Sequence, residues 1–342
     1  MRVAKAKKDM HLDLRVAVLL GIAPLLPSLP ACGGSGTSAD SPVPTSSHPV
    51  PPSDAGAGAV VSDAGSPSPP GPISDDAGSV SPGASPPDAG ATHSRKRGIA
   101  YGSNSDADLA ALSAGIGWWY NWSSSPDATL TKGSAYSGVE FVPMIWGGTF
   151  DPTKLATQVP VGAKYLLTFN EPNFNAQSNL TPQQAAALWP KVQAFADAHA
   201  LAIVSPALNY CGGGCNETNP FTWLDAFFAA CTGCRVDYVA AHWYACTKSA
   251  LQGYLSEYET KYDKPLWLTE FSCLDGSIAA TDANEAKYMS DALALLESDP
   301  KVFRYSWFTG RYTSKPAISL LGADGGVLTP LGQAYVAFPE GP

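Results

Sequence analysis

The sequence predicts an α/β fold, a (β/α)8 TIM barrel of eight parallel strands, over residues 97–342. From Arg97 onward, short apolar runs alternate with stretches of helical periodicity, which is the pattern of repeated strand–helix units. This part comprises roughly 240 residues, close to the ~250 of a typical barrel. An open doubly wound sheet is the alternative, but no glycine-rich phosphate loop follows the first run, 98–101.

The apolar runs define the expected strands, and the periodic stretches between them define the expected helices. The strands are expected at 98–101, 117–119, 140–145, 165–169, 202–205, 238–243, 266–269 and 304–308. Helices are expected at 181–200, 220–231, 249–261 and 282–298, with a shorter one within 103–113 and a loop over 122–138. Thr181 followed by Pro182 is a typical N-cap with proline at the first helical position.

The N-terminus has the order of an export signal. Basic residues precede a short apolar run, 16–29, which is too short to span a bilayer comfortably. The string Leu-Pro-Ala-Cys-Gly-Gly at 29–34 resembles a bacterial lipoprotein box. We therefore expect a lipoprotein-type signal peptide at 1–31 and a lipid on Cys32, which would anchor the exported protein to the cell envelope. The alternative is ordinary secretion, with an incidental cysteine after the cleavage site.

Residues 32–96 are predicted to be a disordered linker. The segment is rich in Pro, Ser, Gly, Ala and Asp, and residues 33–94 contain no Phe, Trp or Tyr. It therefore cannot bury enough apolar surface to offset the entropy of ordering. We expect it to act as a spacer that holds the barrel away from the membrane.

Six cysteines remain in the predicted barrel, and an even number in an exported protein favours disulfides. They are Cys211, Cys215, Cys231, Cys234, Cys246 and Cys273. We expect local bridges among the first four and a bridge from Cys246 to Cys273, although the sequence alone does not fix the connectivity. The spacing of the first four is also close to that of a four-thiolate zinc site, which is the alternative.

The composition limits the possible partners. The formal net charge is −9, so the chain offers no basic surface for nucleic acid. All nine tryptophans lie in the predicted barrel, which suits a neutral, hydroxyl-rich ligand such as a sugar. With only five histidines in the chain, we expect no metal-ligand cluster and no cofactor. The sequence contains no Gly-x-Ser-x-Gly elbow, so it does not indicate an esterase. We expect a monomer.

Two carboxylates follow different predicted strands. Asn170 and Glu171 come directly after the run 165–169, and Glu270 follows the run 266–269. In a barrel the carboxyl ends of the strands meet at one mouth, so both glutamates are expected there. Glycosidic cleavage requires two carboxyl groups on either side of the scissile bond. A single glutamate at a strand end is usually a surface carboxylate, but two on these strands favour catalysis.

These residues resemble those of known glycosidases. The string Asn-Glu-Pro after the fourth strand, with a glutamate ending the seventh, looks like clan A of the glycoside hydrolases. The strings Trp-Trp-Tyr-Asn-Trp at 118–122, His-Trp-Tyr at 242–244 and Trp-Leu-Thr-Glu-Phe at 267–271 resemble glycoside hydrolase family 128, the catalytic core shared with fungal alkali-sensitive-linkage proteins. The resemblance spans 98–308. It implies retaining hydrolysis of β-1,3-glucan by double displacement. Endo action is the leading hypothesis, and exo action is the alternative.

The resemblance also implies roles for individual residues. Glu171 would be the acid/base and Glu270 the nucleophile, with their carboxyl groups ~5 to 5.5 Å apart for a retaining outcome. Asn170 would hydrogen-bond the sugar 2-hydroxyl, although it could be a turn residue. His242 and Tyr244 point to one face of their strand, and Tyr244 could donate to Glu270. A core histidine is the alternative for His242.

Aromatic residues near the strand ends are candidate sugar platforms. Trp307 is expected to form the floor of the subsite where cleavage occurs, while Trp122, Trp146 and Trp243 could line neighbouring subsites. Asn209 could also reach the cleft. Each tryptophan could instead belong to the core, where aromatic side chains are common.

Two other functions stay open at this point. A clan A glycosidase acting on another β-glycan would use the same two glutamates. A non-catalytic β-glucan-binding protein of the cell surface would not need them. Because both glutamates are present, the sequence favours an enzyme.

Overall fold

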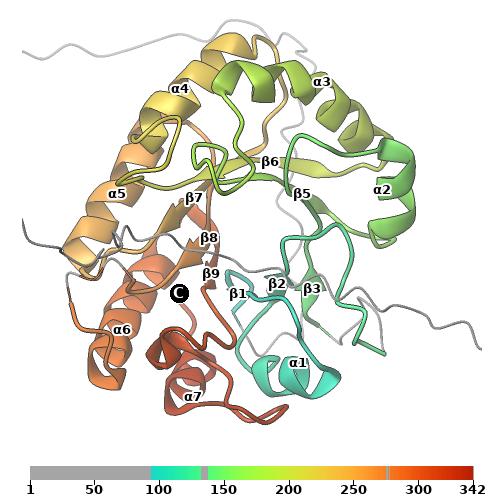
Figure 1. Ribbon diagram of the computed structural model, residues 1–342. Coiled ribbons are helices and arrows are strands. Elements are labelled where there is room, and N and C mark those ends of the chain that lie inside the picture. The colour runs from blue at the N-terminus through green and yellow to red at the C-terminus, as the bar shows by residue number, and fades with distance from the viewer. Residues whose placement is uncertain (1–93, 132–137, 275, 277, 342) are drawn as a thin grey trace, which may run out of the picture. The chain divides into compact units, whose positions relative to one another are not determined.

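The computed structural model describes residues 94–131, 138–274, 276 and 278–341 (Figure 1). The predicted signal peptide at 1–31, the lipidation site Cys32 and nearly all of the predicted linker lie outside the described residues. Among the helices that are described, none combines the length and the apolar character needed to cross a membrane.

Among the described residues, nine strands form one sheet in which all pairings are parallel. They are β1 (Arg97–Ala100), β2 (Trp118–Tyr120), β3 (Glu140–Phe141), β4 (Met144–Ile145), β5 (Tyr165–Asn170), β6 (Ala202–Leu208), β7 (Tyr238–Trp243), β8 (Leu266–Phe271) and β9 (Val302–Trp307). Their order in the sheet is β3-β2-β1-β9-β8-β7-β6-β5-β4. Each of the eight expected runs therefore contributes to the sheet.

The third expected strand, 140–145, is split into β3 and β4. Its first half pairs with β2, and the amide of Val142 donates to the Trp119 carbonyl at 2.9 Å. Its second half pairs with β5, and the amide of Leu167 donates to the Pro143 carbonyl at 2.9 Å. One short segment thus contacts strands from both ends of the sheet order. The result is a curled parallel sheet with helices outside it, an α/β fold consistent with a TIM-like barrel (Figure 1).

The expected helices form close to their predicted bounds. They are α1 (Asp106–Leu112), α3 (Pro182–Ala198), α4 (Pro220–Ala230), α5 (Lys248–Lys261) and α6 (Asp282–Ser298). Thr181 caps α3 as predicted, since its hydroxyl accepts from the amide of Gln184, whose side chain accepts in return from the amide of Thr181. The sequence did not reveal three short helices, α2 (Pro152–Gln158), η1 (Pro316–Ile318) and α7 (Pro330–Ala337), because a helix of two turns or fewer shows little periodicity.

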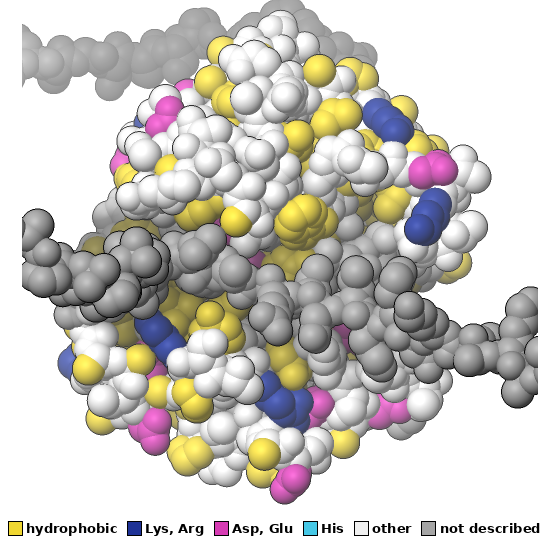
Figure 2. Space-filling model, in the orientation of Figure 1, with side chains coloured by type: hydrophobic (Ala, Val, Ile, Leu, Met, Phe, Trp, Pro, Cys, Tyr) yellow, Lys and Arg dark blue, Asp and Glu magenta, His cyan; other side chains and the backbone are white. Residues whose placement is uncertain are grey.

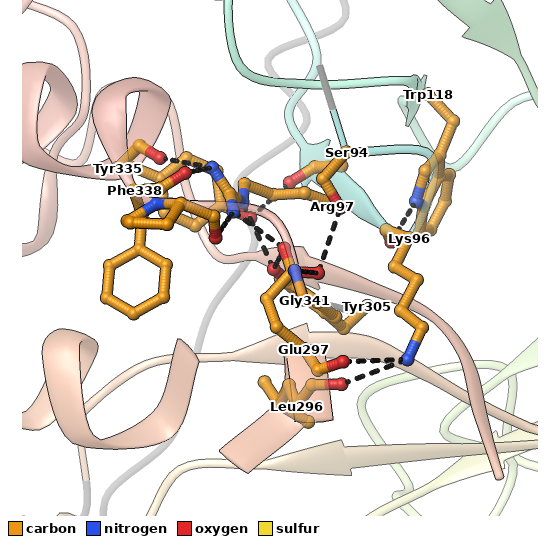
Figure 3. A network of polar contacts seen from close by, with 12 residues as sticks. Ser94, Lys96, Arg97, Trp118, Leu296, Glu297, Tyr305, Tyr335, Phe338 and Gly341 are labelled. Carbon is orange, nitrogen blue, oxygen red and sulfur yellow. Dashed lines mark hydrogen bonds and ion pairs between the residues drawn. The ribbon is translucent and has the colours of Figure 1, made fainter. Parts of the chain in front are cut away.

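A buried ion pair connects the first strand to the C-terminal part of the fold (Figure 3). Arg97 of β1 is 1% exposed and lies 2.6 Å from Glu297 of α6. Its remaining N–H groups donate to the Tyr305 hydroxyl at 3.0 Å and to the carbonyls of Tyr335 and Phe338 at 2.9 Å each. The guanidinium therefore ties β1, β9, α6 and the end of α7 together.

The last residues of the predicted linker belong to this network. The Ser94 hydroxyl donates to Glu297 Oε2 at 3.1 Å, and Lys96 Nζ donates to the carbonyls of Glu297 at 3.1 Å and Asp299 at 2.8 Å. The contacts with α6 thus include Ser94 and Lys96, the last described residues of the predicted linker. Ser94 is buried and Lys96 is half-buried, and neither has an apolar side chain that would have signalled this packing.

The six barrel cysteines form three disulfides, which confirms the expected pairing. The bridges are Cys211–Cys215, Cys231–Cys234 and Cys246–Cys273. The alternative of a four-thiolate zinc site is excluded, because the sulfurs that would ligate the metal are bonded in pairs. Cys246–Cys273 joins the segments that follow β7 and β8, next to Glu270.

Candidate active site

Glu171 and Glu270 meet at the carboxyl ends of their strands. Glu171 directly follows β5 and is 8% exposed, whereas Glu270 is the second-last residue of β8 and is 4% exposed. A carboxylate oxygen of each and a ring nitrogen of His242 all lie within 4.8 Å of one another. The structure therefore brings together the two glutamates that the sequence selected.

The backbone at Glu171 is unusual. Its φ angle is +40°, in the left-handed region that non-glycine residues rarely adopt. Two backbone hydrogen bonds hold it there, from the Glu171 amide to the Ala207 carbonyl and from the Phe174 amide to the Glu171 carbonyl, each at 2.9 Å. Strained backbone that neighbouring structure enforces is concentrated at functional sites, so this conformation supports a functional position for Glu171.

His242 bridges the two glutamates. It is fully buried in β7, and its Nδ1 lies 3.0 Å from Glu171 Oε1 while its Nε2 lies 3.5 Å from Glu270 Oε1. Burial alone would lower the pKa of His242, but the charges of Glu270 and Glu171 outweigh burial and raise it. His242 is therefore both a buried histidine and a member of the site, which combines the two interpretations that the sequence left open.

Three side chains donate hydrogen bonds to Glu270. The Tyr120 hydroxyl and the Trp122 indole donate to Oε1, at 3.0 and 2.7 Å, and the Tyr244 hydroxyl donates to Oε2. The bond from Tyr244 was expected, but Tyr120 was not selected from the sequence. Trp118 and Tyr120 are two apart in β2 and so share a face, and Trp122 follows the strand, which is the sequence signal that could have pointed to Tyr120.

The pKa of Glu270 is raised above its ordinary value although three hydrogen bonds favour its charged form. Burial raises its pKa, and the charge of Glu171 adds to that effect. The charge of His242 and the bonds from Tyr244 and Trp122 act in the opposite direction but do not fully compensate. Burial also raises the pKa values of Tyr120 and Tyr244 well above the usual range, so both keep the protons that they donate.

The expectation that no metal-ligand cluster exists needs a correction. Glu171, His242 and Glu270 form a buried group whose oxygen and nitrogen atoms could in principle hold a cation. The sequence did not show this because the three residues are far apart along the chain. In the structure, Nδ1 of His242 is paired with Glu171 Oε1 at 3.0 Å, whereas Nε2 lies 3.5 Å from Glu270 Oε1 without a hydrogen bond.

A cavity of about 610 Å³ opens beside this cluster. Trp122 and Trp146 form part of its wall, together with Phe150, Gln158 and Ser178. Trp146 is 40% exposed, so part of its ring is accessible to a ligand. On the face drawn in Figure 2, hydrophobic and uncharged side chains predominate and charged groups are scattered. Such a surface suits a neutral ligand.

Comparisons with known proteins agree with this geometry. A family profile described as "Glycosyl hydrolase catalytic core" matches residues 98–335. The crystal structure of a family 128 (subgroup II) endo-β-1,3-glucanase from Sorangium cellulosum is 48% identical, with a TM-score of 0.66, over 72% of this chain and 99% of that one. The chain belongs to glycoside hydrolase family 128. The resemblance inferred from the sequence is thereby confirmed.

Two further relatives show the range of the similarity. A family 128 (subgroup I) endo-β-1,3-glucanase from Amycolatopsis mediterranei, crystallised with laminaritriose, is 32% identical with a TM-score of 0.59 over 71% of this chain and 99% of that one. Alkali-sensitive linkage protein 1 of Schizosaccharomyces pombe is 30% identical over 260 residues, or 71% of this chain. The chain spans only 45% of the length of that curated relative.

Asn170 and Asn209 lie at the carboxyl ends of neighbouring strands in this family 128 chain. Asn170 is the last residue of β5 and not a turn residue, and its side-chain amide donates to Gln177 Oε1 at 3.2 Å. Asn209 directly follows β6 and is half-buried, and its backbone carbonyl accepts from Asn173 Nδ2 at 2.8 Å. Both are near the mouth, and their contacts with sugar stay predictions.

Trp307 does not lie with the other predicted site residues. It is fully buried, and its indole N–H donates to the Ile318 carbonyl at 2.8 Å, on the side of the sheet that the helices cover. The next residue, Phe308, occupies the position that was expected for Trp307. Its ring centroid lies 6.0 Å from that of Trp122 and 5.7 Å from that of Tyr244. Because neighbouring residues of a strand point to opposite faces, an error of one residue moves a side chain from cleft to core.

Trp243 is also a core residue. It is buried and packs against Tyr254 of α5, with ring centroids 4.6 Å apart. His242 and Tyr244, on either side of it in the chain, contact the glutamates. The alternation along β7 therefore assigns Trp243 to the outer face, and the prediction that it lines a subsite is corrected.

Proposed function

We propose that this chain is a retaining endo-β-1,3-glucanase in which Glu171 is the acid/base and Glu270 the nucleophile. The observation that carries the proposal is the pair of buried carboxylates at one mouth, with oxygens within 4.8 Å of each other. Retaining enzymes place their carboxyl groups ~5 to 5.5 Å apart, whereas inverting enzymes need ~6.5 to 9.5 Å to admit a water. The substrate follows from the endo-β-1,3-glucanases among its relatives.

The reaction then proceeds in two balanced steps. In the first step Glu270 forms a bond to the anomeric carbon as the glycosidic bond breaks. The leaving oxygen keeps the electron pair of the broken bond and takes a proton from Glu171. In the second step the Glu171 carboxylate removes a proton from water while the water oxygen bonds to the anomeric carbon. The ester bond breaks, and its electron pair returns to Glu270. His242 lies between the two glutamates and interacts electrostatically with both.

Exposed aromatic residues on both sides of Glu171 supply platforms for glucosyl units. Trp146 follows β4 and Tyr210 follows β6, with 40% and 46% of their surfaces exposed. Both strands are direct neighbours of β5 in the sheet, one on each side, so a glucan chain crossing the mouth would meet both rings. Trp122 and Trp146 would hold it within the 610 Å³ cavity, and Asn170 would bind the 2-hydroxyl of the reacting sugar.

The proposal extends to the whole chain. The strands that pair with both halves of 140–145 support a closed (β/α)8 barrel from residue 97 onward. A signal peptide at 1–31, a lipid on Cys32 and a linker up to the barrel would anchor a monomeric enzyme to the bacterial envelope, where it would reach wall or environmental glucan. The composition of these segments and the three disulfides support an exported protein.

Laminarin digestion tests the proposal. The purified chain should release laminari-oligosaccharides of mixed size early in the reaction, and the product reducing ends should first appear as the β-anomer in a proton NMR time course. Glu270→Ala should lose at least ~10³-fold in kcat, because no nucleophile remains. Lys287→Ala on the exposed face of α6 is the control and should match the wild type.

Three outcomes would overturn parts of the proposal. Glucan binding without cleavage by wild type and variant alike would make the chain a binding protein. First release of the α-anomer would make the enzyme inverting. Cleavage of another β-glycan in preference to laminarin would place it elsewhere in the clan.

A further inference from the structure

The two oxygens of Glu270 are held unequally. Oε1 accepts hydrogen bonds from the Tyr120 hydroxyl at 3.0 Å and the Trp122 indole at 2.7 Å, and His242 Nε2 lies 3.5 Å from the same oxygen. Oε2 accepts one bond, from the Tyr244 hydroxyl. A carboxylate oxygen has about two acceptor positions, so two donors fill those of Oε1 and one donor leaves a position open on Oε2.

We propose that Tyr120 and Trp122 are positioning residues that hold Oε1 of Glu270, so that Oε2 is the oxygen that bonds to the anomeric carbon. This inference rests on the proposed function, since it assigns an atom within that mechanism. It assigns a positioning role to Tyr120, which was not among the predicted site residues, and to Trp122. It also gives the two carboxylate oxygens of Glu270 different roles.

The bond changes agree with this division. When Oε2 bonds to the anomeric carbon, Oε1 becomes the carbonyl oxygen of the glycosyl ester and can keep both of its donors. Tyr244 donates to the oxygen that changes its bonding, so its hydrogen bond weakens as the ester forms. In the second step the bond between the anomeric carbon and Oε2 breaks, the electron pair returns to Oε2, and Tyr244 again donates to a full carboxylate.

The fold keeps both donors rigid. Tyr120 is fully buried in β2, and its hydroxyl oxygen also lies 3.1 Å from the Thr269 carbonyl oxygen. Trp122 has a φ of +58°, and its ring packs edge-on against Tyr120 and Phe308, with centroids 5.4 and 6.0 Å away. The strained backbone of Trp122 thus accompanies a ring held on two sides, as expected for a residue whose orientation has a function.

Removing single donors tests the role of each residue. Tyr120→Phe and Trp122→Phe keep an aromatic ring but lose the group that donates to Oε1. With an aryl β-laminaribioside as substrate, each should lower kcat by ~10- to 100-fold, because a misplaced reacting group costs that order of rate. KM should stay near the wild-type value for Tyr120→Phe and rise for Trp122→Phe, since Trp122 also lines the cavity.

Two variants separate positioning from general damage. Tyr238→Phe removes a hydroxyl that pairs with Tyr165 at the start of β7, away from the mouth, and should leave kcat unchanged. Trp146→Phe alters the same cavity without a contact to Glu270, so it should raise KM and preserve kcat. Circular dichroism and thermal melting show whether each variant is folded. Unchanged kcat in folded Tyr120→Phe and Trp122→Phe would overturn the positioning role.

A trapped intermediate tests the atom itself without any variant. Wild-type enzyme treated with a 2-deoxy-2-fluoro-β-laminaribiosyl fluoride should crystallise as the ester, with the sugar on Oε2 and with Tyr120 and Trp122 on Oε1. An ester through Oε1 would overturn the inference while leaving the proposed function intact. Wild type that neither cleaves laminarin nor forms an ester would instead refute the proposed function.

Discussion

His242 determines how charge is shared between the two glutamates. Its two nitrogens face Glu171 and Glu270, at 3.0 and 3.5 Å, and the pair of carboxylates raises its pKa. The positive charge that results lowers the pKa of Glu270 against the opposing effect of burial. A neutral side chain at this position would remove that stabilisation and leave two buried carboxylates facing each other.

The pH dependence of the reaction should report this balance. Glu270 must be ionised to attack, so activity is lost as the pH falls through its pKa, which burial raises above the ordinary value of 4.5. The acid limb of kcat/KM in the wild type should therefore lie above pH 4.5. His242→Gln removes the charge that lowers the pKa of Glu270, so the acid limb should move to higher pH.

The exposed His199 provides the matched control. His199→Gln, at the end of α3, should leave the pH profile of laminarin hydrolysis unchanged. An acid limb that stays in place or moves to lower pH in His242→Gln would show that the histidine charge does not support ionisation of Glu270.

At the scale of elements, the ends of β7 and β8 form one unit. The Leu274 amide donates to the Tyr244 carbonyl at 2.8 Å, and the Ser272 amide donates to the Trp243 carbonyl at 3.3 Å. The Cys246–Cys273 bridge joins the same two segments across 27 residues of sequence. Tyr244 and the Glu270 that it contacts are therefore held by covalent and hydrogen bonds together.

Removing this bridge should affect stability and turnover. Cys246→Ala with Cys273→Ala should lower the free energy of unfolding by about 2–4 kcal/mol, as expected for a loop of this length. It should also lower kcat, because Tyr244 and Glu270 lose part of their support. Urea unfolding followed by tryptophan fluorescence and laminarin kinetics measure the two effects.

The Cys231–Cys234 bridge separates the two effects. It follows α4, closes a short loop and makes no contact with the glutamates, so Cys231→Ala with Cys234→Ala should cost less stability and preserve kcat. An equal loss of kcat in both double variants would show that the Cys246–Cys273 bridge has no particular role at the site.

The positions of the strands were predictable because each strand is a compact apolar run. The face of the sheet on which an individual side chain lies was not predictable. The last strand begins at Val302 and not at residue 304, and its register with β8 is irregular, so the choice between Trp307 and Phe308 depended on the pleat. The contact of Tyr120 with Glu270 joins residues 150 apart in sequence. That contact exists only because the sheet curls and brings β2 opposite β8.

At the scale of the whole molecule, the Arg97–Glu297 pair joins the beginning and the end of the fold. Its side chains are 1% and 5% exposed, and the hydrogen bonds from Ser94 and Tyr305 add to it (Figure 3). Burial alone would raise the pKa of Glu297, but the bonds from Tyr305 and Arg97 outweigh burial and lower it. The pair therefore contributes stability while Glu297 is ionised.

Glu297→Ala should lower the free energy of unfolding by about 3–5 kcal/mol at pH 7, because it leaves the Arg97 charge buried without its partner. A group with a lowered pKa stabilises the folded state above its unfolded-state pKa, and this contribution disappears as the pH falls through the lower folded-state value. The difference between wild type and variant should therefore shrink below pH 4.5. Urea titrations at several pH values measure it, with Lys287→Ala, from an exposed pair, expected to change stability by less than ~1 kcal/mol. A difference that is independent of pH would show that packing, and not the ion pair, holds β1 to α6.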